Sequence, residues 1–398
     1  MHFCSFLLLA SLIVLSLNHP ADAGSIAFNQ QVDTLVDNGG FVLSGNNHIV
    51  AEHNAEKLFI PASILKIATS LASLSILGPE YRFRTELYLT NNNDLYIKGS
   101  GDPYLTSEEV RLILSTLKEK GVTTINTIFL DDTAFQLDSR SNGSLQSLNP
   151  YDASNSALAV NFNTINIIRG HEGSILSAEP QTPTLPIMKS LGAYLAPGTH
   201  RINITQDHEN ISIHTGELFR AIQQELGIAG SGPIASQAIP ENASPFHTHI
   251  SSKNLQEIIP SLLLYSNNFV ANQLFLTCGM KTYGSPATWA KGQSAIKTFM
   301  HSLGISDSEF HIIEGSGLSP ENRITARAMI DLLNAFKPYS HTLTKSHGNF
   351  VKSGTLTGVY SYAGYVMEEN RKHSFVIMLN QKRNTRLQLL ELLQKNLP

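Results

Sequence analysis

The sequence has only two cysteines and one tryptophan, and charged residues make up just 15% of its 398 residues. Two cysteines cannot form the set of cross-links that holds a disulfide-rich domain together. With 28 basic and 32 acidic residues the net charge is -4, which excludes a nucleic-acid binder that works through bulk positive charge. The apolar content of 42% supports a large buried core rather than disorder, and the length favours two domains.

An uncharged apolar run lies near the N-terminus, over residues 3–17, and Ala21-Asp22-Ala23 follows it. This small-x-small pattern is typical of the site at which a signal peptide is cut, and the run is shorter than the roughly 20 residues of a membrane-spanning helix. We therefore expect a signal peptide at 1–23, no stable membrane span, and a periplasmic or secreted mature protein. Because no Lys or Arg precedes the run, retention of the leader stays an alternative. Cleavage would leave Cys278 without a disulfide partner, and we expect its thiol to be buried.

Hydrophobic spacing predicts an α+β fold assembled from both ends of the chain. Residues 62–77 are apolar around most of a helical circumference, which predicts a buried helix that ends before Gly78-Pro79. Loops within a smaller domain are expected where Ser, Asn, Gly and Pro are frequent, at 136–150 and 170–186. The other expected elements are a hairpin at 41–43 and 48–52, strands at 83–89, 95–98, 127–130, 359–366 and 375–379, and helices at 106–120, 217–226, 251–278 with a break near Ser266, 325–336 and 386–394.

The pattern Ser-x-x-Lys occurs three times, and its setting separates the copies. The copies at 115–118 and 294–297 lie on amphipathic helices, where a solvated face is expected. Ser63 and Lys66 instead open the apolar helix, where an unpaired ammonium would be costly to bury. Three residues apart on a helix, they share one face, so Lys66 can reach the Ser63 hydroxyl. A lysine can act as the base for a serine if burial or a second cation lowers its pKa.

Two other motifs could complete such a site. Residues 352–355 read Lys-Ser-Gly-Thr, and Gly354 would let a strand edge approach a substrate closely. Residues 266–268 read Ser-Asn-Asn and fall in the break between two apolar helical stretches. Taken singly, the first could be an ordinary turn and the second a helix cap, since Ser-x-Asn also occurs at 44–46 and 147–149. The order and spacing of these two motifs and of Ser63-x-x-Lys66 argue against a purely structural role for all three together.

In this order, Ser63-x-x-Lys66, Ser266-x-Asn268 and Lys352-Ser353-Gly354 resemble the active-site motifs of penicillin-binding proteins and serine β-lactamases. Four longer stretches, at 59–63, 99–103, 315–319 and 352–360, resemble more closely the penicillin-binding protein 4 type of D-alanyl-D-alanine carboxypeptidase/endopeptidase, of low-molecular-mass class C. These stretches belong to a resemblance that runs from about residue 40 to the end, so it is far more specific than any one motif.

The resemblance implies a fold and a domain organisation. The fold is a β-lactamase/transpeptidase-like domain, an antiparallel sheet flanked by helices plus a helical cluster, formed by residues 24–84 and 241–398. A smaller second domain is inserted at 85–240, and the segments at 131–135 and 159–164 look like family segments within it. Because the stretch 170–201 is short, we expect the third domain of some family members to be reduced or missing.

The resemblance also implies an activity, that of a serine-type D-Ala-D-Ala carboxypeptidase and endopeptidase on peptidoglycan stem peptides and cross-links. The expected partners are those peptides and β-lactams, without nucleic acid, metal or cofactor. We expect the following roles: Ser63 as nucleophile, Lys66 as base, Ser266 as proton relay, Asn268 as holder of the substrate amide, Lys352, Ser353, Gly354 and Thr355 as the carboxylate site, and the N–H groups of Ser63 and Thr355 as the oxyanion hole.

Two departures from the family pattern concern substrate recognition. Glu314 and Pro320 stand where the family usually has Asp and Arg, around Gly-Ser-Gly-Leu-Ser. These changes bear on recognition of the substrate side chain rather than on catalysis.

Other functions are weaker interpretations. A serine β-lactamase would use the same nucleophile, and residues 265–267 could be its Tyr-x-Asn, but the long insertion favours a peptidase. A non-catalytic peptidoglycan- or β-lactam-binding module need not keep a buried lysine such as Lys66. His247 and His249 could start a zinc site, yet no third ligand stands at a metal-site spacing. A Ser-His-Asp hydrolase is disfavoured because Gly-x-Ser-x-Gly does not occur.

Overall fold

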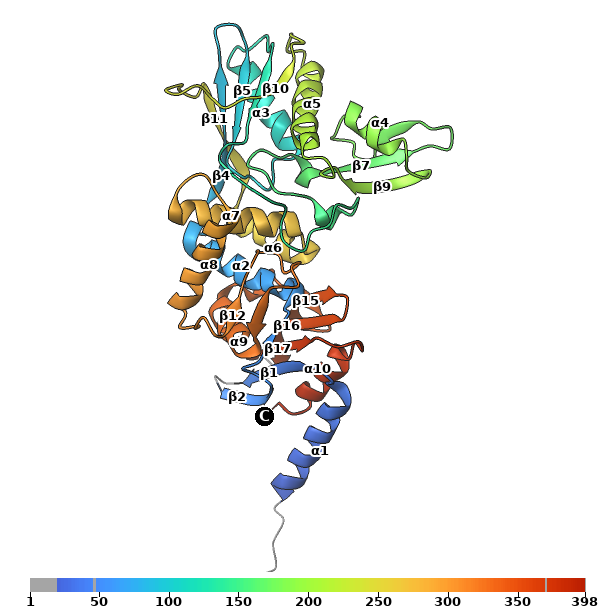
Figure 1. The fold of residues 1–398 in the computed structure, drawn as a ribbon, viewed down its shortest axis with the longest axis vertical. Helices are drawn as coiled ribbons and strands as arrows, with labels where there is room; N and C mark the ends of the chain where they lie inside the picture. Colours follow the sequence, from blue (N-terminus) through green and yellow to red (C-terminus); the bar gives the residue numbers. More distant parts are fainter. Residues whose placement is uncertain (1–19, 46–47, 369–370, 398) are drawn as a thin grey trace, which may run out of the picture.

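The computed structural model describes residues 20–45, 48–368 and 371–397. Figure 1 shows an elongated molecule with a six-stranded sheet near one end, a five-stranded sheet at the other, and a helical cluster between them. The apolar run at 3–17, and with it most of the predicted leader, lies outside the described residues. Among the described helices, none combines the length and the apolar character needed to cross a membrane.

The six-stranded sheet joins the two ends of the chain. Its order is β14-β15-β16-β17-β1-β2 and all of its pairings are antiparallel. The sequence ends meet where β1 pairs with β17, in a register that sets Gly39 opposite Leu379. The sequence predicted an α+β fold assembled from both ends of the chain, and the pairing of β1 with β17 confirms it. The strands are β1 (Gly39–Gly45), β2 (His48–His53), β14 (Thr344–Ser346), β15 (Asn349–Leu356), β16 (Val359–Glu368) and β17 (Arg371–Leu379).

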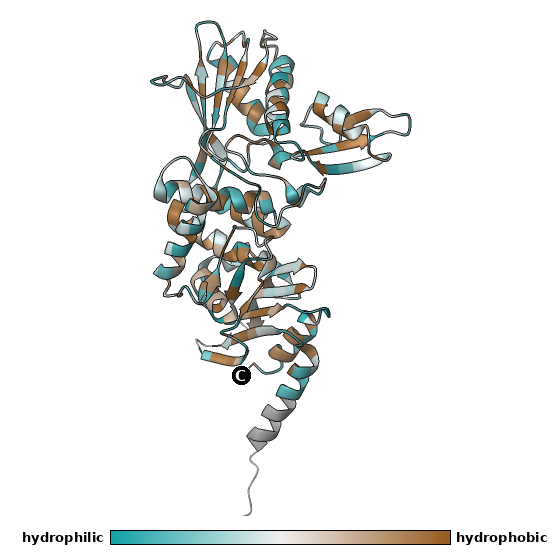
Figure 2. Ribbon diagram, viewed as in Figure 1, coloured by the Kyte–Doolittle hydropathy of each residue, from teal (hydrophilic) through white to brown (hydrophobic). Residues whose placement is uncertain are grey.

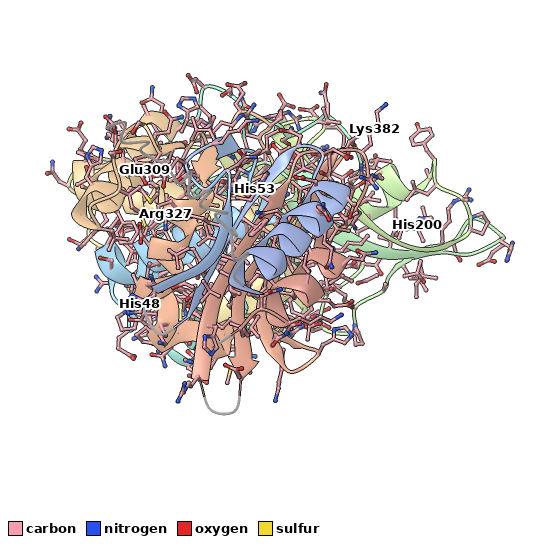
Figure 3. The ribbon with its side chains drawn as sticks, turned by 90° about the horizontal axis from the view of Figure 1, so that it is seen from below. His48, His53, His200, Glu309, Arg327 and Lys382 are labelled. Atoms are coloured by element: carbon pink, nitrogen blue, oxygen red, sulfur yellow. The ribbon has the colours of Figure 1, made fainter. Side chains whose placement is uncertain are left out.

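Each face of this sheet is covered by helices. α1 (Pro20–Leu35) and α10 (Arg386–Gln394) contribute to an apolar cluster on one face, and the view from below shows α1 lying across the strands (Figure 3). Helices of the central cluster cover the other face. Figure 2 shows brown, hydrophobic segments on the strands of this sheet and on the helices of the central cluster, with teal segments among them.

The helical cluster surrounds the predicted apolar helix. A 3-10 turn, Ala62–Ile64, leads into α2 (Leu65–Leu77), and every residue from Leu65 to Leu74 is buried, which confirms the prediction. The predicted break near Ser266 is also present, between α6 (Leu255–Tyr265) and α7 (Asn268–Tyr283). The remaining elements here are α8 (Trp289–Ser302), α9 (Ala326–Phe336), the 3-10 segment Lys337–Thr342, and a small sheet of β12 (Phe310–His311), β13 (Arg323–Thr325) and β3 (Leu58–Phe59).

The five-stranded sheet has the order β10-β6-β5-β4-β11 and its own apolar core with α3 and α5. Its strands are β4 (Arg82–Leu89), β5 (Leu95–Gly99), β6 (Ile128–Asp131), β10 (Ile234–Ser236) and β11 (His247–Asn254), beside α3 (Ser107–Glu119) and α5 (Glu209–Glu225). The sheet therefore runs from residue 82 to residue 254, slightly beyond the insertion expected at 85–240 on either side.

A small lobe projects beside this sheet (Figure 1). It contains a three-stranded sheet of β7 (Thr164–Arg169), β8 (Ile175–Ser177) and β9 (Gly198–Asn203), together with α4 (Pro186–Gly192). Two 3-10 turns, Pro150–Asp152 and Asn161–Asn163, lead into it. The stretch predicted as loop at 170–186 thus includes β8, whose Ile175 and Leu176 form too short an apolar run to give a period in the sequence.

Candidate active site

Ser63 and Lys66 lie at the start of α2, where the backbone changes from the 3-10 turn to the α-helix. Lys66 Nζ donates a hydrogen bond of 3.0 Å to Ser63 Oγ, as the three-residue spacing predicts. The ammonium also donates to Asn268 Oδ1 at 2.7 Å and to the Ser316 carbonyl at 2.7 Å. Its three donors are therefore directed at a nucleophile candidate and at two neutral acceptors.

The surroundings of Lys66 favour its neutral form. The side chain is fully buried, and no described carboxylate lies within ion-pair distance of it. Burial and, to a smaller extent, the positive charge of Lys352 lower the pKa of Lys66 to about 7. The more distant Glu314 carboxylate acts in the opposite direction. A lysine with this pKa can accept a proton from a serine at neutral pH.

Ser266 and Asn268 come from the break between α6 and α7. Ser266 adopts a left-handed conformation, with φ of 52°, at the C-terminal end of α6, and Asn267 caps α7 through a hydrogen bond from the Val270 amide. Asn268, whose Oδ1 accepts from Lys66, donates its Nδ2 to the Tyr151 carbonyl at 3.1 Å. The break therefore both caps a helix and orients two site residues, so the two interpretations of Ser-x-Asn do not exclude each other.

Lys352 reaches the same site from the six-stranded sheet. On β15 its Nζ donates to Ser266 Oγ at 2.9 Å and to the Ser353 carbonyl at 2.9 Å. Burial, followed by the charge of Arg386, lowers the pKa of Lys352 to about 8. Hydrogen bonds thus connect Ser63, Lys66 and Asn268 on one side and Lys352 and Ser266 on the other.

Gly354 allows β15 to lie directly against the nucleophile turn. A Cβ atom added to Gly354 would come within 2.8 Å of the Ser63 amide nitrogen and 2.9 Å of the Pro61 carbonyl oxygen. Such distances are too short for any residue with a side chain, so this close approach requires glycine. The backbone of β15 at Gly354, just before Thr355, therefore lies close to the backbone of Ser63. The side chains of Ser353 and Thr355 are exposed along the strand.

A loop from β12 to β13 closes the site behind Lys66. The carboxylate of Glu314 is fully buried and accepts hydrogen bonds from the amides of Ser316 and Ser319, from Ser316 Oγ, and from Asn322 Nδ2. Glu314 thereby fixes the carbonyl of Ser316 that accepts from Lys66. This residue therefore acts on the loop, whereas Pro320 is exposed.

Sequence reasoning missed three contributors to the site. The carbonyls of Ser316 and Tyr151 accept hydrogen bonds from Lys66 and Asn268, and a backbone acceptor leaves no mark in the sequence. Arg386 Nη1, at the start of α10, donates to the Gly354 carbonyl and to Thr355 Oγ1, both at 3.1 Å. A lone arginine in a C-terminal helix carries no motif that could have identified it.

The remaining sequence candidates lie elsewhere. Lys118 and Lys297 of the other Ser-x-x-Lys copies are exposed, as expected. His249 Nε2 lies 2.6 Å from Glu109 Oε2, and the described residues hold no group of three potential metal ligands. Cys278 is buried in α7, as predicted, and burial raises the pKa of its thiol to about 12.

Chemically, this arrangement offers a hydroxyl next to a lysine that can be neutral at pH 7. A second cation lies beside a second hydroxyl, and a strand edge passes the nucleophile. It matches the requirements of nucleophilic acyl transfer: an activated serine, a proton relay, and positive charge for an anionic substrate group.

Comparisons with known proteins agree with this chemistry. The model of the D-Ala-D-Ala carboxypeptidase 3 (S13) family matches residues 29–190 and 192–348. A D-alanyl-D-alanine carboxypeptidase of Actinomadura sp. (strain R39) is 24% identical over 92% of this chain and 79% of its own length.

Solved structures show the same fold. Penicillin binding protein 4 of Haemophilus influenzae superposes with a TM-score of 0.75 at 20% identity, over 90% of this chain and 94% of that chain. A predatory peptidoglycan endopeptidase of Bdellovibrio bacteriovorus superposes with a TM-score of 0.53 at 16% identity, over 90% of both chains.

Proposed function

This chain belongs to the D-Ala-D-Ala carboxypeptidase 3 (S13) family, and we propose that it hydrolyses D-Ala-D-Ala stem peptides, and D-Ala cross-links, of peptidoglycan through an acyl-enzyme on Ser63. The family match confirms the resemblance noted in the sequence, and the family is one of serine peptidases. The single observation that carries the proposed mechanism is the buried Lys66 ammonium, which points at Ser63 Oγ with no carboxylate paired to it among the described residues.

Acylation begins with neutral Lys66. Its Nζ takes the proton of the Ser63 hydroxyl as Oγ attacks the carbonyl carbon between the two D-Ala residues. The negative charge that develops on the carbonyl oxygen is stabilised by the backbone N–H groups of Ser63 and Thr355, which the close approach at Gly354 supports. In this scheme, Asn268 holds the substrate amide.

Collapse of the intermediate breaks the peptide bond. The leaving amine takes up, through the Ser266 hydroxyl, the proton that Lys66 removed from Ser63, which leaves Lys66 neutral again. The Ser266 hydroxyl accepts a hydrogen bond from Lys352. The terminal carboxylate lies against Lys352, Ser353 and Thr355, on a strand that Gly354 lets pass close to the nucleophile. Water then cleaves the ester, which releases the shortened peptide and restores Ser63.

A β-lactam would acylate the same serine, because its strained amide stands in for the D-Ala-D-Ala bond. We also propose that the protein acts outside the cytoplasm, where peptidoglycan lies, after loss of residues 1–23. The apolar run at 3–17 and Ala21-Asp22-Ala23 support this location.

The proposed organisation is a peptidase domain of residues 24–84 and 241–398 with an insertion at 85–240, whose five-stranded sheet also takes in the start of β4 and all of β11 from the flanking segments. It is supported by the pairing of β1 with β17 and by a separate apolar core between the five-stranded sheet and α3 and α5.

Intact-mass measurement after incubation with benzylpenicillin tests the proposal, with Ser63→Ala as the matched variant. We expect a lasting adduct of one penicillin on the wild-type protein and none on the variant, and release of D-Ala from a pentapeptide by the wild type only. An adduct that persists in Ser63→Ala would refute the assigned nucleophile.

The same measurement separates the rival functions. Rapid consumption of benzylpenicillin without a lasting adduct would indicate a β-lactamase. Neither adduct nor consumption would indicate a non-catalytic binding module.

A further inference from the structure

A cavity lies next to the proposed active site, at the α6–α7 break. Its volume is about 690 Å³, within the range of small-molecule sites. Its lining comes from α6, the α6–α7 break, the end of β11, the segment before α3, and the projecting lobe. The residues used below are Tyr104, Phe162, Arg201, Lys253, Tyr265 and Asn267.

The break between α6 and α7 separates the two sites. Ser266 and Asn268 are bonded to Lys352 and Lys66, whereas their neighbours Tyr265 and Asn267 line the cavity. The Tyr265 side chain is 76% exposed. One short backbone segment, residues 265–268, therefore contributes side chains to both places.

The cavity holds a row in which two cations flank a pair of aromatic rings. The Arg201 guanidinium lies 6.0 Å from the centroid of the Phe162 ring, which meets the Tyr104 ring edge-on at 5.4 Å. At the other end of the row, Lys253 Nζ lies 5.7 Å from the centroid of the Tyr104 ring. Contacts of this kind orient a cation without neutralising its charge.

Both cations remain available to an anion. Within the described part of the chain neither Arg201 nor Lys253 forms an ion pair, and the only side-chain hydrogen bonds of Arg201 are two long ones, of 3.4 Å, to Thr164 Oγ1. Two carboxylates also line the cavity. That of Glu179 accepts from Asn166 and Thr182, and Glu108 is exposed in the first turn of α3.

Phe162 connects this row to the catalytic elements. It belongs to three consecutive residues with positive φ, at 48°, 60° and 53° for Asn161, Phe162 and Asn163. This conformation is a genuine outlier for a bulky side chain. It places the ring edge-on to Phe269 at 6.3 Å, directly after Asn268 in α7.

We propose that this cavity is an exosite that binds a carboxylate of the peptidoglycan peptide outside the scissile D-Ala-D-Ala unit, through Arg201 and Lys253. The inference rests on the proposed function and deepens it, because stem peptides carry free carboxylates and a cross-link brings two of them to the enzyme. Arg201 supplies the planar donor pair that suits a carboxylate, and Lys253 supplies a second positive charge.

Calorimetric binding to the Ser63→Ala protein tests the exosite without turnover. The probes are a cross-linked dimer of stem peptides and the short peptide N-acetyl-D-Ala-D-Ala. We expect the dimer to bind more tightly than the short peptide, and Arg201→Ala and Lys253→Ala each to weaken the dimer about tenfold, as loss of a charged hydrogen bond does. Neither substitution should change binding of the short peptide.

Lys189→Ala is the matched control, because Lys189 is an exposed cation of the same lobe, on α4, that does not line the cavity. It should leave the affinity for the dimer unchanged. Dimer affinity that is unchanged in the Arg201→Ala, Lys253→Ala double variant would overturn the exosite, as would equal affinity of the Ser63→Ala protein for the two probes.

Benzylpenicillin acylation of the Arg201→Ala and Lys253→Ala proteins, with Ser63 intact, tests the exosite separately from the proposed function. We expect acylation at the wild-type rate in both variants, because penicillin occupies only the reaction centre. Acylation reduced as much as dimer binding would overturn the exosite in favour of general damage to the site. Failure of acylation in the wild type would instead refute the proposed function, and the binding result would still stand.

Discussion

The same four-residue pattern has opposite surroundings at the start of α2 and on α8. Ser63 and Lys66 lie in the helical cluster, where Lys66 is fully buried and bonded to neutral acceptors. Ser294 and Lys297 lie on a surface helix, where the Lys297 side chain is 52% exposed and pairs with Asp307 at 2.7 Å. Both pairs have the spacing that lets a lysine reach a serine on one helix face.

The difference between the two regions is electrostatic. Lys297 keeps contact with water and has an acidic partner, Asp307. Lys66 has neither contact with water nor an acidic partner among the described residues, and Lys352 lies nearby. Its neutral form therefore becomes accessible near pH 7. The motif supplies the geometry of a base, and the tertiary environment supplies its basicity.

Removal of each lysine in turn is expected to have the largest effect. Lys66→Met should slow benzylpenicillin acylation by about 10²- to 10⁴-fold, the usual contribution of a general base, because Ser63 loses its proton acceptor. Lys297→Met should acylate at the wild-type rate. Stopped-flow acylation kinetics measure both, with thermal melts to verify folding, and equal rates for the two variants would contradict the role of Lys66.

A smaller effect is expected from the loop that holds Lys66 in place. Glu314→Gln should lower the free energy of unfolding by about 1–3 kcal/mol, because an amide cannot accept all the hydrogen bonds that the buried carboxylate receives. Urea denaturation measures this loss. Glu314→Asp, which keeps the charge, should lose less, and a Glu314→Gln protein as stable as the wild type would show that the loop is held by other contacts.

The smallest expected effect is the change of the acylation rate with pH. The rate should rise as pH increases through about 7, where Lys66 loses its proton, and fall above about 8, where Lys352 loses the charge that holds the substrate carboxylate. The two limbs belong to the coupled pair rather than to either lysine alone.

Lys352→Gln provides the control for that profile. Because the charge of Lys352 lowers the pKa of Lys66, its removal should move the acid limb to higher pH. A profile that stays flat between pH 6 and pH 9 in the wild type would contradict a lysine base.

Most helices and strands could be predicted because hydrophobic spacing reports burial directly. The break at Ser266 and the apolar helix from Ala62 follow from the sequence, since buried helices carry a nearly continuous apolar surface. The small lobe could not be predicted in this way, because β8 spans only Ile175–Ser177 and its stability comes from pairing with β7. Such a short strand is stabilised by pairing with its neighbour and not by an apolar period of its own.

The candidate site also contains residues that the sequence could predict and others that it could not. Ser63, Lys66, Ser266 and Lys352 could be named because their residue types recur in a fixed order with motif spacing. Arg386 and the carbonyl of Ser316 could not be named, because the first reaches β15 only through the docking of α10 and the second is a backbone atom of a folded loop.

The class of fold and the residue types of the candidate serine site follow from the sequence alone, since periodicity and motif order can be read along the chain. The lowered pKa of Lys66 depends on folding, because its burial and the proximity of Lys352 arise when segments 286 positions apart in the sequence meet. The row of Arg201, Phe162, Tyr104 and Lys253 likewise exists only after folding, because its members come from separate elements brought together around one cavity.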